Sequence, residues 1–230
     1  MTQNLPRFSI ASVLGRLGTG QPADDHAALD AVALVDDMRA REMRLRKWIP
    51  AKILRRFDKG FARSNTIQPS TARALYAITR AARADVILET GTYWGYSTAV
   101  LAAAARDSGV GSVHTFDLYK HAGQHIPKSL LPWVTMYRGE PATATMPRVL
   151  PALPRARVFF QDSVHDYDGV LAELRAASPF LATNSVVLFH DFIVEGVRKA
   201  AMDGLPNHQV GLVEVDDPQQ LGIALPLSLA

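Results

Sequence analysis

Carboxylate and imidazole side chains follow four short apolar stretches of this 230-residue sequence. The residues at these positions are Glu89, Asp117, Asp162 and the pair His190–Asp191. If the four stretches are strands of one parallel sheet, their carboxyl ends share an edge, and ligands bind in the crevice there. Carboxylates in such a crevice can bind cations or sugar hydroxyls, and a histidine can exchange a proton near neutral pH. The pattern therefore predicts a single polar cleft.

The loop at 89–98 follows the first apolar stretch and narrows the choice of ligand. Gly91 and Gly95 allow the backbone to turn tightly and to approach a ligand closely. The Gly-x-Gly-x-x-Gly spacing of dinucleotide-binding loops is absent, because Thr92–Trp94 fill the middle positions. Glu89 beside this loop would also repel phosphates. A cationic cofactor without phosphate groups, such as S-adenosylmethionine (SAM), therefore fits better than NAD.

Asp117 ends the next apolar stretch. A carboxylate at this place can accept hydrogen bonds from both ribose hydroxyls of a bound nucleoside. Proteins that bind NAD and proteins that bind SAM share this feature. Combined with the missing dinucleotide spacing, it favours SAM.

Alternating strand and helix patterns surround these residues. The predicted strands are Asp85–Glu89, Ser112–Asp117, Val134–Arg138, Arg157–Asp162 and Ser185–Asp191, followed by a hairpin of His208–Val215 and Gln220–Leu225. The clearest predicted helices are Ser70–Ala82 with Ser70 as N-cap, Ser97–Ala105 and Tyr167–Leu181. This alternation predicts an α/β fold, a doubly wound Rossmann-like sheet of seven strands, mostly parallel, with an antiparallel C-terminal hairpin and N-terminal helices.

Residues 1–66 are expected to form a helical, basic extension ahead of a catalytic domain at 67–230. A long helix is predicted at Asp24–Trp48, and the stretch 39–63 holds ten Lys or Arg residues against two acidic ones. Apolar residues are interleaved with these charges, namely Trp48, Ile53, Leu54 and Phe57. This pattern favours amphipathic helices that cover the cleft or form a homodimer contact over a nucleic-acid site.

The composition excludes several classes of protein. The sequence has no cysteine, which removes disulfides, thiolate zinc sites and cysteine nucleophiles and is compatible with the cytoplasm, the expected location. No apolar run is long enough to span a bilayer, and the N-terminus lacks the pattern of a secretory signal.

The stretch VILETGTYWGYSTAVLA at 86–102 resembles the first motif of class I SAM-dependent methyltransferases, especially the branch that is similar to catechol O-methyltransferase. Further similarity lies in FDL at 116–118, RGEPA at 138–142, QDSVHDYDGVLAEL at 161–174 and VVLFHDF at 186–192. The resemblance covers about residues 69–225.

The resemblance implies roles for individual residues. The implied cofactor-binding residues are Glu89, Gly91, Tyr93 and Ser97 near the methionyl end, Asp117 at the ribose, Glu140 and Ala142 at the adenine, and Asp162. Asp162, His190 and Asp191 would bind a divalent metal ion such as Mg²⁺ or Mn²⁺, and His165 would be the general base. His190 departs from the family pattern, because imidazole is a poor ligand for Mg²⁺. Either the metal is softer, or His190 is a second base and no metal binds.

The expected reaction is methyl transfer from SAM to a hydroxyl group of a small molecule. A metal ion would lower the pKa of that hydroxyl and a base would remove its proton. An RNA or protein methyltransferase that uses the basic segment is an alternative, although 161–164 lacks the Asn-Pro-Pro-Tyr type of motif found in base N-methyltransferases. A non-catalytic SAM-binding protein is a third reading, and a nucleotide dehydrogenase is the least favoured.

Overall fold

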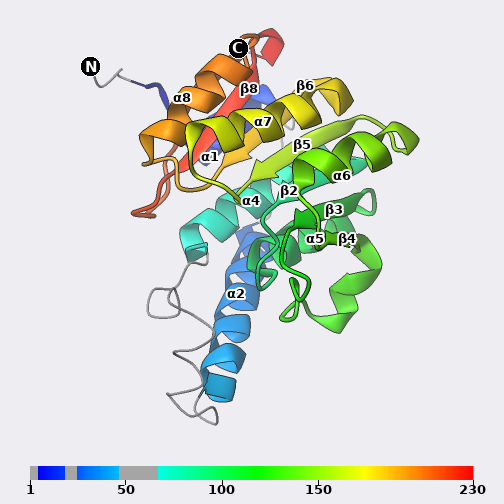
Figure 1. Ribbon diagram of the computed structural model, residues 1–230. Coiled ribbons are helices and arrows are strands. Elements are labelled where there is room, and N and C mark those ends of the chain that lie inside the picture. The colour runs from blue at the N-terminus through cyan, green and yellow to red at the C-terminus, as the bar shows by residue number, and fades with distance from the viewer. Residues whose placement is uncertain (1–4, 19–24, 47–66, 230) are drawn as a thin grey trace.

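The protein, seen in a computed structural model, is built around one eight-stranded sheet (Figure 1). The structure describes residues 5–18, 25–46 and 67–229. The strands are β1 Arg7–Phe8, β2 Val86–Thr90, β3 Ser112–Asp117, β4 Val134–Arg138, β5 Ala156–Gln161, β6 Leu181–Phe189, β7 His208–Val213 and β8 Leu221–Pro226. They lie in the order β1-β7-β8-β6-β5-β2-β3-β4, and β8 alone runs antiparallel to its neighbours β6 and β7. The doubly wound, mostly parallel sheet with a C-terminal hairpin is confirmed.

The predicted number of seven strands was wrong by one. Arg7 and Phe8 form the additional strand β1, which pairs in parallel with β7. The backbone N–H groups of Leu212 and Glu214 donate to the carbonyl oxygens of Pro6 and Phe8, both at 2.9 Å. Two residues are too few to show a strand periodicity, so tertiary contact with β7 fixes this conformation.

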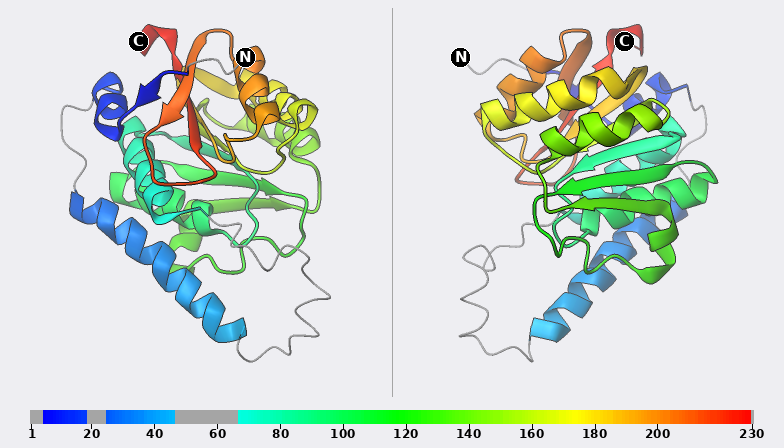
Figure 2. Two further views of the ribbon diagram at one scale, coloured as in Figure 1. Left: turned by 90° about the vertical axis from the view of Figure 1, so that its left-hand side faces the viewer. Right: turned by 45° about the vertical axis from the view of Figure 1, so that its right-hand side comes forward.

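Helices cover both faces of the sheet (Figures 1 and 2). One layer contains α1 Ile10–Arg16, α2 Asp25–Arg46, α4 Pro69–Ala82 and α5 Tyr96–Ser108; the other contains α6 Ala142–Val149, α7 Tyr167–Ala177 and α8 Glu195–Gly204. Short 3₁₀ turns lie at Lys128–Trp133, Leu150–Ala152, Ser178–Phe180 and Leu227–Leu229. None of the described helices combines the length and apolar character needed to cross a membrane.

The central strands are buried on both faces, as expected for a parallel sheet between two helical layers. All five residues of β2 are buried, and Phe159 and Phe160 of β5 point to opposite faces with no exposed surface. Apolar side chains therefore form one cluster on each face. This packing fixes where each strand ends and so where the polar residues that follow are placed.

The described part of α2 packs against α4 and α5, and Figure 2 shows its far end projecting past the sheet. Ala31, Val35 and Met38 are buried against the apolar cluster on that face, and Arg39 donates to the carbonyl oxygen of Ile67. The apolar residues of the basic segment, from Trp48 to Phe57, lie outside the described residues. The division at 66/67 and the cover or homodimer role of the extension stay predictions.

Several helix boundaries differ from the sequence prediction, as at α5, which ends at Ser108 rather than Ala105, and two of the differences have a clear local cause. The N-cap of α4 is Gln68, and the Ser70 hydroxyl instead donates to the carbonyl oxygen of Asp216 at 2.8 Å. Proline at the first helical position needs no capping partner for its own nitrogen, which lets the helix begin earlier. Helix α7 ends at Ala177 because Ser178–Phe180 continues as a 3₁₀ turn containing Pro179.

Candidate active site

The glycine loop between β2 and α5 lies at the carboxyl edge of the sheet, as predicted. Gly91 has φ +89°, and a Cβ atom there would lie 2.1 Å from the carbonyl oxygen of Asp162. Gly95 has φ +90°, and its Cβ would lie 2.3 Å from the side chain of Ile126. Both positions therefore require glycine, for backbone conformation and for space. Gly91 also brings the loop into direct contact with the backbone that carries Asp162.

Asp117, at the end of β3, is fixed by two backbone groups. Its Oδ2 accepts from the N–H of Tyr93 at 2.7 Å and its Oδ1 from the N–H of Tyr119 at 2.6 Å. Each carboxylate oxygen retains a further acceptor site. The side chain lines the cavity and can accept hydrogen bonds from a sugar there.

A cavity of about 890 Å³ opens at this edge of the sheet. Seven predicted site residues line it, namely Gly91, Tyr93, Asp117, Ala142, Asp162, His165 and Asp191. The apolar part of its wall includes Phe116, Leu118 and Pro141 beside Asp117. A nucleoside needs this combination of an apolar wall for the base and a carboxylate for the ribose. The cavity therefore fits the nucleoside part of SAM.

Four other predicted site residues do not line this cavity: Glu89, Ser97, Glu140 and His190. The Glu89 carboxylate is fully buried behind the glycine loop, where Ser97 Oγ and Thr98 Oγ1 donate to it at 2.6 and 2.5 Å. Burial raises the pKa of Glu89 to about 7 despite these hydrogen bonds. Glu140 instead binds Arg148 at 2.6 Å, which lowers the pKa of its exposed carboxylate.

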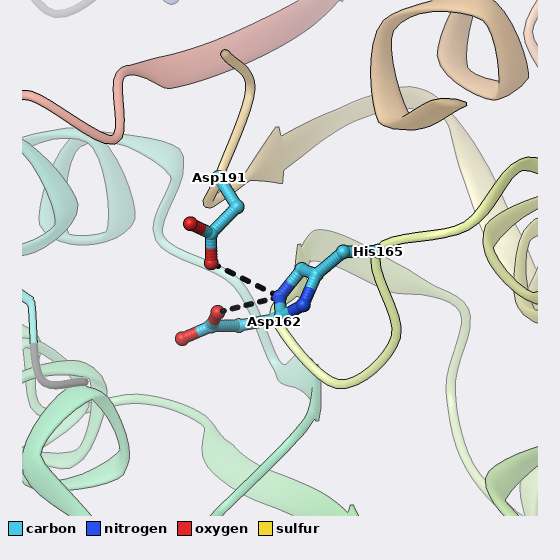
Figure 3. A group of neighbouring side chains, drawn as sticks. All are labelled: Asp162, His165 and Asp191. Atoms are coloured by element: carbon cyan, nitrogen blue, oxygen red, sulfur yellow. Dashed lines mark ion pairs between the residues drawn. The ribbon is translucent and has the colours of Figure 1, made fainter. Parts of the chain in front are cut away.

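Asp162, His165 and Asp191 converge on one side of the cavity (Figure 3). His165 Nε2 lies 3.0 Å from Asp191 Oδ2 and 3.8 Å from Asp162 Oδ1. The carboxylates of Asp162 and Asp191 raise the pKa of His165 to about 9. Burial opposes ionisation of Asp191, but His165 and His190 outweigh it and lower the pKa of Asp191.

Asp191 has a strained backbone with φ +49°, which is uncommon for a residue other than glycine. It follows β6 directly, and Gln219 Nε2 donates to its Oδ1 at 2.9 Å. Such strain persists only where surrounding contacts hold it, and it is found more often at functional sites. The contacts of the Asp191 side chain with His165 and Gln219 can hold this backbone conformation.

His190 lies behind the two carboxylates, with its side chain only 2% exposed. Its Nδ1 is 3.1 Å from Asp162 Oδ1 and 3.4 Å from Asp191 Oδ2, while its Nε2 is 3.5 Å from Asp217 Oδ2. Burial opposes its positive charge, but these three carboxylates outweigh it and raise the pKa of His190 to about 12. The structure therefore places a buried imidazole ring, outside the cavity lining, where the sequence predicted a metal ligand.

Asp162, His165 and Asp191 each offer a ligand atom within 4.8 Å of the other two, so these three could hold a divalent ion. His165 takes the third place that the sequence prediction gave to His190. Two carboxylate oxygens and one imidazole nitrogen suit Mn²⁺ or a similar transition metal better than Mg²⁺, which prefers oxygen ligands.

The sequence analysis missed three polar residues near the site. Gln219 and Asp217 come from the turn between β7 and β8, and Glu173 comes from α7. Ser163 Oγ and Thr90 Oγ1 donate to Glu173 at 2.5 and 2.8 Å, which ties down the loop between Asp162 and His165. No spacing in the sequence marks these residues, because each meets the site only through the tertiary fold.

Solved structures with the same fold include several methyltransferases. Cofactor-bound Rv0187 from MTB is 19% identical, with 94% of this chain and 96% of that chain covered and a TM-score of 0.57. The O-methyltransferase TomG from Streptomyces achromogenes, in complex with SAM, is 18% identical over 94% and 96% of the two chains, with a TM-score of 0.59. An O-methyltransferase from Bacillus cereus in complex with SAH is 18% identical over 77% and 93%, with a TM-score of 0.55. The fold is therefore that of class I methyltransferases.

Residues 88–192 match a family described as a methyltransferase domain. This match spans the glycine loop, Asp117 and the Asp162–Asp191 cluster. No curated protein matches the sequence. The chain therefore has the fold of these methyltransferases, and its central part matches a methyltransferase domain.

Proposed function

We propose that this enzyme transfers the methyl group of SAM to a hydroxyl group of a small molecule, with His165 as the general base. The observation that carries the proposal is the pairing of His165 with Asp191 at 3.0 Å, inside the cavity that Asp117 also lines. A base on one wall and a ribose-binding carboxylate on another are the two parts that this reaction requires.

Asp117 would hold the ribose of SAM, and Ala142 would lie beside its adenine. Gly91 would let the backbone approach the methionyl part, with Tyr93 nearby. SAM supplies an electrophilic methyl group when bound. Glu89 and Ser97 would act from behind the loop, because they bind each other rather than line the cavity.

Because His165 Nε2 faces Asp191 at 3.0 Å, Nε2 would carry the ring proton of the neutral histidine and Nδ1 would remove the proton of the acceptor hydroxyl. Asp191 would orient this ring and stabilise the imidazolium that forms. Since the pKa of His165 is about 9, only about 1% of it is neutral at pH 7 in the absence of other charges. A bound cation, or the positive charge of SAM, would lower this pKa and favour the neutral base.

Metal assistance is a second form of the same proposal, favoured by the convergence of Asp162, His165 and Asp191. A divalent ion, Mn²⁺ in preference to Mg²⁺, would lower the pKa of the acceptor hydroxyl when bound. A neutral His165 that bound the ion through Nε2 would carry its proton on Nδ1 and so could not also be the base. In this form the hydroxyl loses its proton to solvent or to another group.

Small-molecule acceptors are supported by the names of two structural neighbours. One is TomG, involved in tomaymycin synthesis, and the other is a TDP-rhamnose 3'-O-methyltransferase of calicheamicin biosynthesis. RNA or protein methylation would need the basic segment at 39–63, of which only the part up to residue 46 is described. A bare SAM-binding role would leave the His165–Asp191 pair without a purpose.

Calorimetry with SAM, S-adenosylhomocysteine and NAD tests cofactor choice. We expect the first two to bind and NAD not to bind; NAD binding, or no SAM binding by folded protein, would refute the proposal. Turnover with a panel of hydroxylated acceptors follows, after chelation and again with Mn²⁺ or Mg²⁺ restored. Full activity after chelation selects the metal-free form, and activity restored by the ion selects the metal-assisted form. Methylation of RNA or protein alone would contradict both.

A further inference from the structure

A buried carboxylate lies beneath the site, outside the cavity. Asp217 belongs to the turn between β7 and β8, and its side chain has no exposed surface. Thr71 Oγ1 donates to its Oδ2 at 2.5 Å, and the backbone N–H of Gln219 donates to its Oδ1 at 2.9 Å. Its Oδ2 also lies 3.5 Å from Nε2 of His190.

A turn rich in acidic residues normally faces solvent, as the neighbouring Asp216 does. Burying a carboxylate costs several kcal/mol unless an opposite charge and hydrogen bonds compensate it. Two neutral donors satisfy part of Asp217, and the ring of His190 faces its Oδ2 at 3.5 Å. The fold therefore directs this buried carboxylate at His190.

His190 connects Asp217 to two carboxylates of the cavity wall. The ring does not line the cavity and is only 2% exposed. Its Nδ1 lies 3.1 Å from Asp162 Oδ1 and 3.4 Å from Asp191 Oδ2. The same turn reaches Asp191 a second time, because Gln219 Nε2 donates to Asp191 Oδ1. The β7–β8 turn is therefore connected to both carboxylates that face His165.

We propose that Asp217 is a positioning residue of the active site. It anchors the ring of His190, and His190 in turn holds Asp162 and Asp191 in the orientation that they present to His165 and the cavity. Thr71 and Ser70 fasten the turn from the other side, since both hydroxyls bind it from the start of α4. The effect on turnover rests on the proposed function, whereas the effect on His190 does not.

The first test compares Asp217→Asn with Asp216→Asn. The two variants make the same change of charge at adjacent positions, one buried and one exposed. We expect Asp217→Asn to keep the Kd for SAM and the KM for the acceptor within about threefold, while kcat falls by roughly 10- to 100-fold, as for other residues that orient site ligands. Asp216→Asn should change none of these. An unchanged kcat in Asp217→Asn, or an equal fall in both variants, would overturn the proposal.

The second test needs no acceptor and therefore separates this proposal from the proposed reaction. The measurement is the NMR spectrum of protein with ¹⁵N-labelled histidine. The ring nitrogen chemical shifts of one histidine, His190, should change in Asp217→Asn and also in Asp162→Asn. They should stay unchanged in Asp216→Asn. Ring signals unaffected by Asp217→Asn would overturn the inference even if methyl transfer is established. If no acceptor is found, this spectrum still tests whether Asp217 contacts His190.

A third variant covers the case in which Asp217→Asn does not fold. Thr71→Val removes one hydrogen bond from Asp217 and keeps its charge. It should move the same histidine signals by a smaller amount and lower kcat in the same direction. Histidine signals identical to those of the unchanged protein would count against the inference.

Discussion

The two sides of the cavity are held in place by different kinds of contact. On the side that we propose binds the cofactor (the cofactor side), backbone groups do most of the positioning. Gly91 and Gly95 adopt positive φ values, and the N–H groups of Tyr93 and Tyr119 fix Asp117. On the side of the proposed base (the catalytic side), imidazole and carboxylate groups hold one another, as in the contacts of His165 with Asp191 and of His190 with Asp162.

This difference has a physical consequence. Backbone positioning rests on N–H groups and glycine conformations that carry no ionisable charge, so it persists when a single charge changes. A network of paired charges depends on every member, because removing one leaves its partner buried and uncompensated. The cofactor side should therefore respond to changes of shape, and the catalytic side to changes of charge.

The largest expected effect lies on the catalytic side, at His165→Ala. We expect kcat to fall by roughly 10²–10⁴-fold, the usual contribution of a positioned base, with SAM affinity unchanged within about twofold. The matched control is His121→Ala, at an exposed histidine in the segment after β3 that should retain full activity. Steady-state kinetics and calorimetry provide both measurements, and an unaltered kcat would reject His165 as the base.

The pH profile sharpens the same prediction. Without metal, the rate in the unchanged enzyme should rise with pH up to about 9, because His165 accepts a proton only when neutral and its pKa is raised to about 9. His165→Ala should lose this rise. A rate independent of pH between 6 and 9 after chelation would contradict the assignment.

Gly91→Ala should disturb both sides of the cavity at once. The added Cβ would lie 2.1 Å from the carbonyl oxygen of Asp162, so the loop and the catalytic strand end must move apart. We expect a loss of about 2–4 kcal/mol in the free energy of unfolding, from strain and overpacking together, with weaker SAM binding and lower kcat. Gly109→Ala is the control, because it has φ +68° and nothing within 4 Å. It should cost about 1 kcal/mol. Equal losses in urea unfolding would show that contact with Asp162 is unimportant.

Asp117→Ala tests the cofactor side alone. The loss of charged hydrogen bonds to the ribose should weaken SAM binding by about 1.5–3 kcal/mol, or roughly 10- to 150-fold in Kd. The exposed Asp85→Ala at the opposite end of the sheet should leave Kd unchanged. In Asp117→Ala the NMR signals of the His165 and His190 rings should also stay unchanged. Calorimetry that finds no loss of affinity would remove Asp117 from the binding site.

The smallest effect concerns Glu89 and appears only as a dependence on pH. Its pKa of about 7 in the folded protein lies above its ordinary value near 4.5, so folding favours the protonated carboxyl. The free energy of unfolding should therefore fall by about 2 kcal/mol as pH rises from 5 to 7. In Glu89→Gln this decline should be absent. Urea unfolding at several pH values measures the slope, and parallel slopes in the two proteins would contradict the burial argument.

The comparison also explains what the sequence could predict. The strands, the glycine loop and Asp117 follow from local periodicity and from one short motif. His165 and Asp162 share a loop, so their proximity could be predicted as well. The position of His190 behind the two carboxylates, outside the cavity that His165 lines, could not be predicted, because it depends on how packing at the end of β6 turns this ring inward. Asp217 lies 55 residues beyond Asp162 in the chain, and only the antiparallel hairpin brings it beneath the site.

The short strand β1 has a consequence for the sheet as a whole. A strand at the edge of a sheet offers unpaired N–H and carbonyl groups to any passing chain, and such edges promote self-association. Residues 6–8 occupy these groups along β7 through hydrogen bonds to Leu212 and Glu214. A protein shortened to begin at α4 would expose this edge next to the hairpin that carries Asp217. Such a protein should aggregate more readily during folding, whatever the state of its active site.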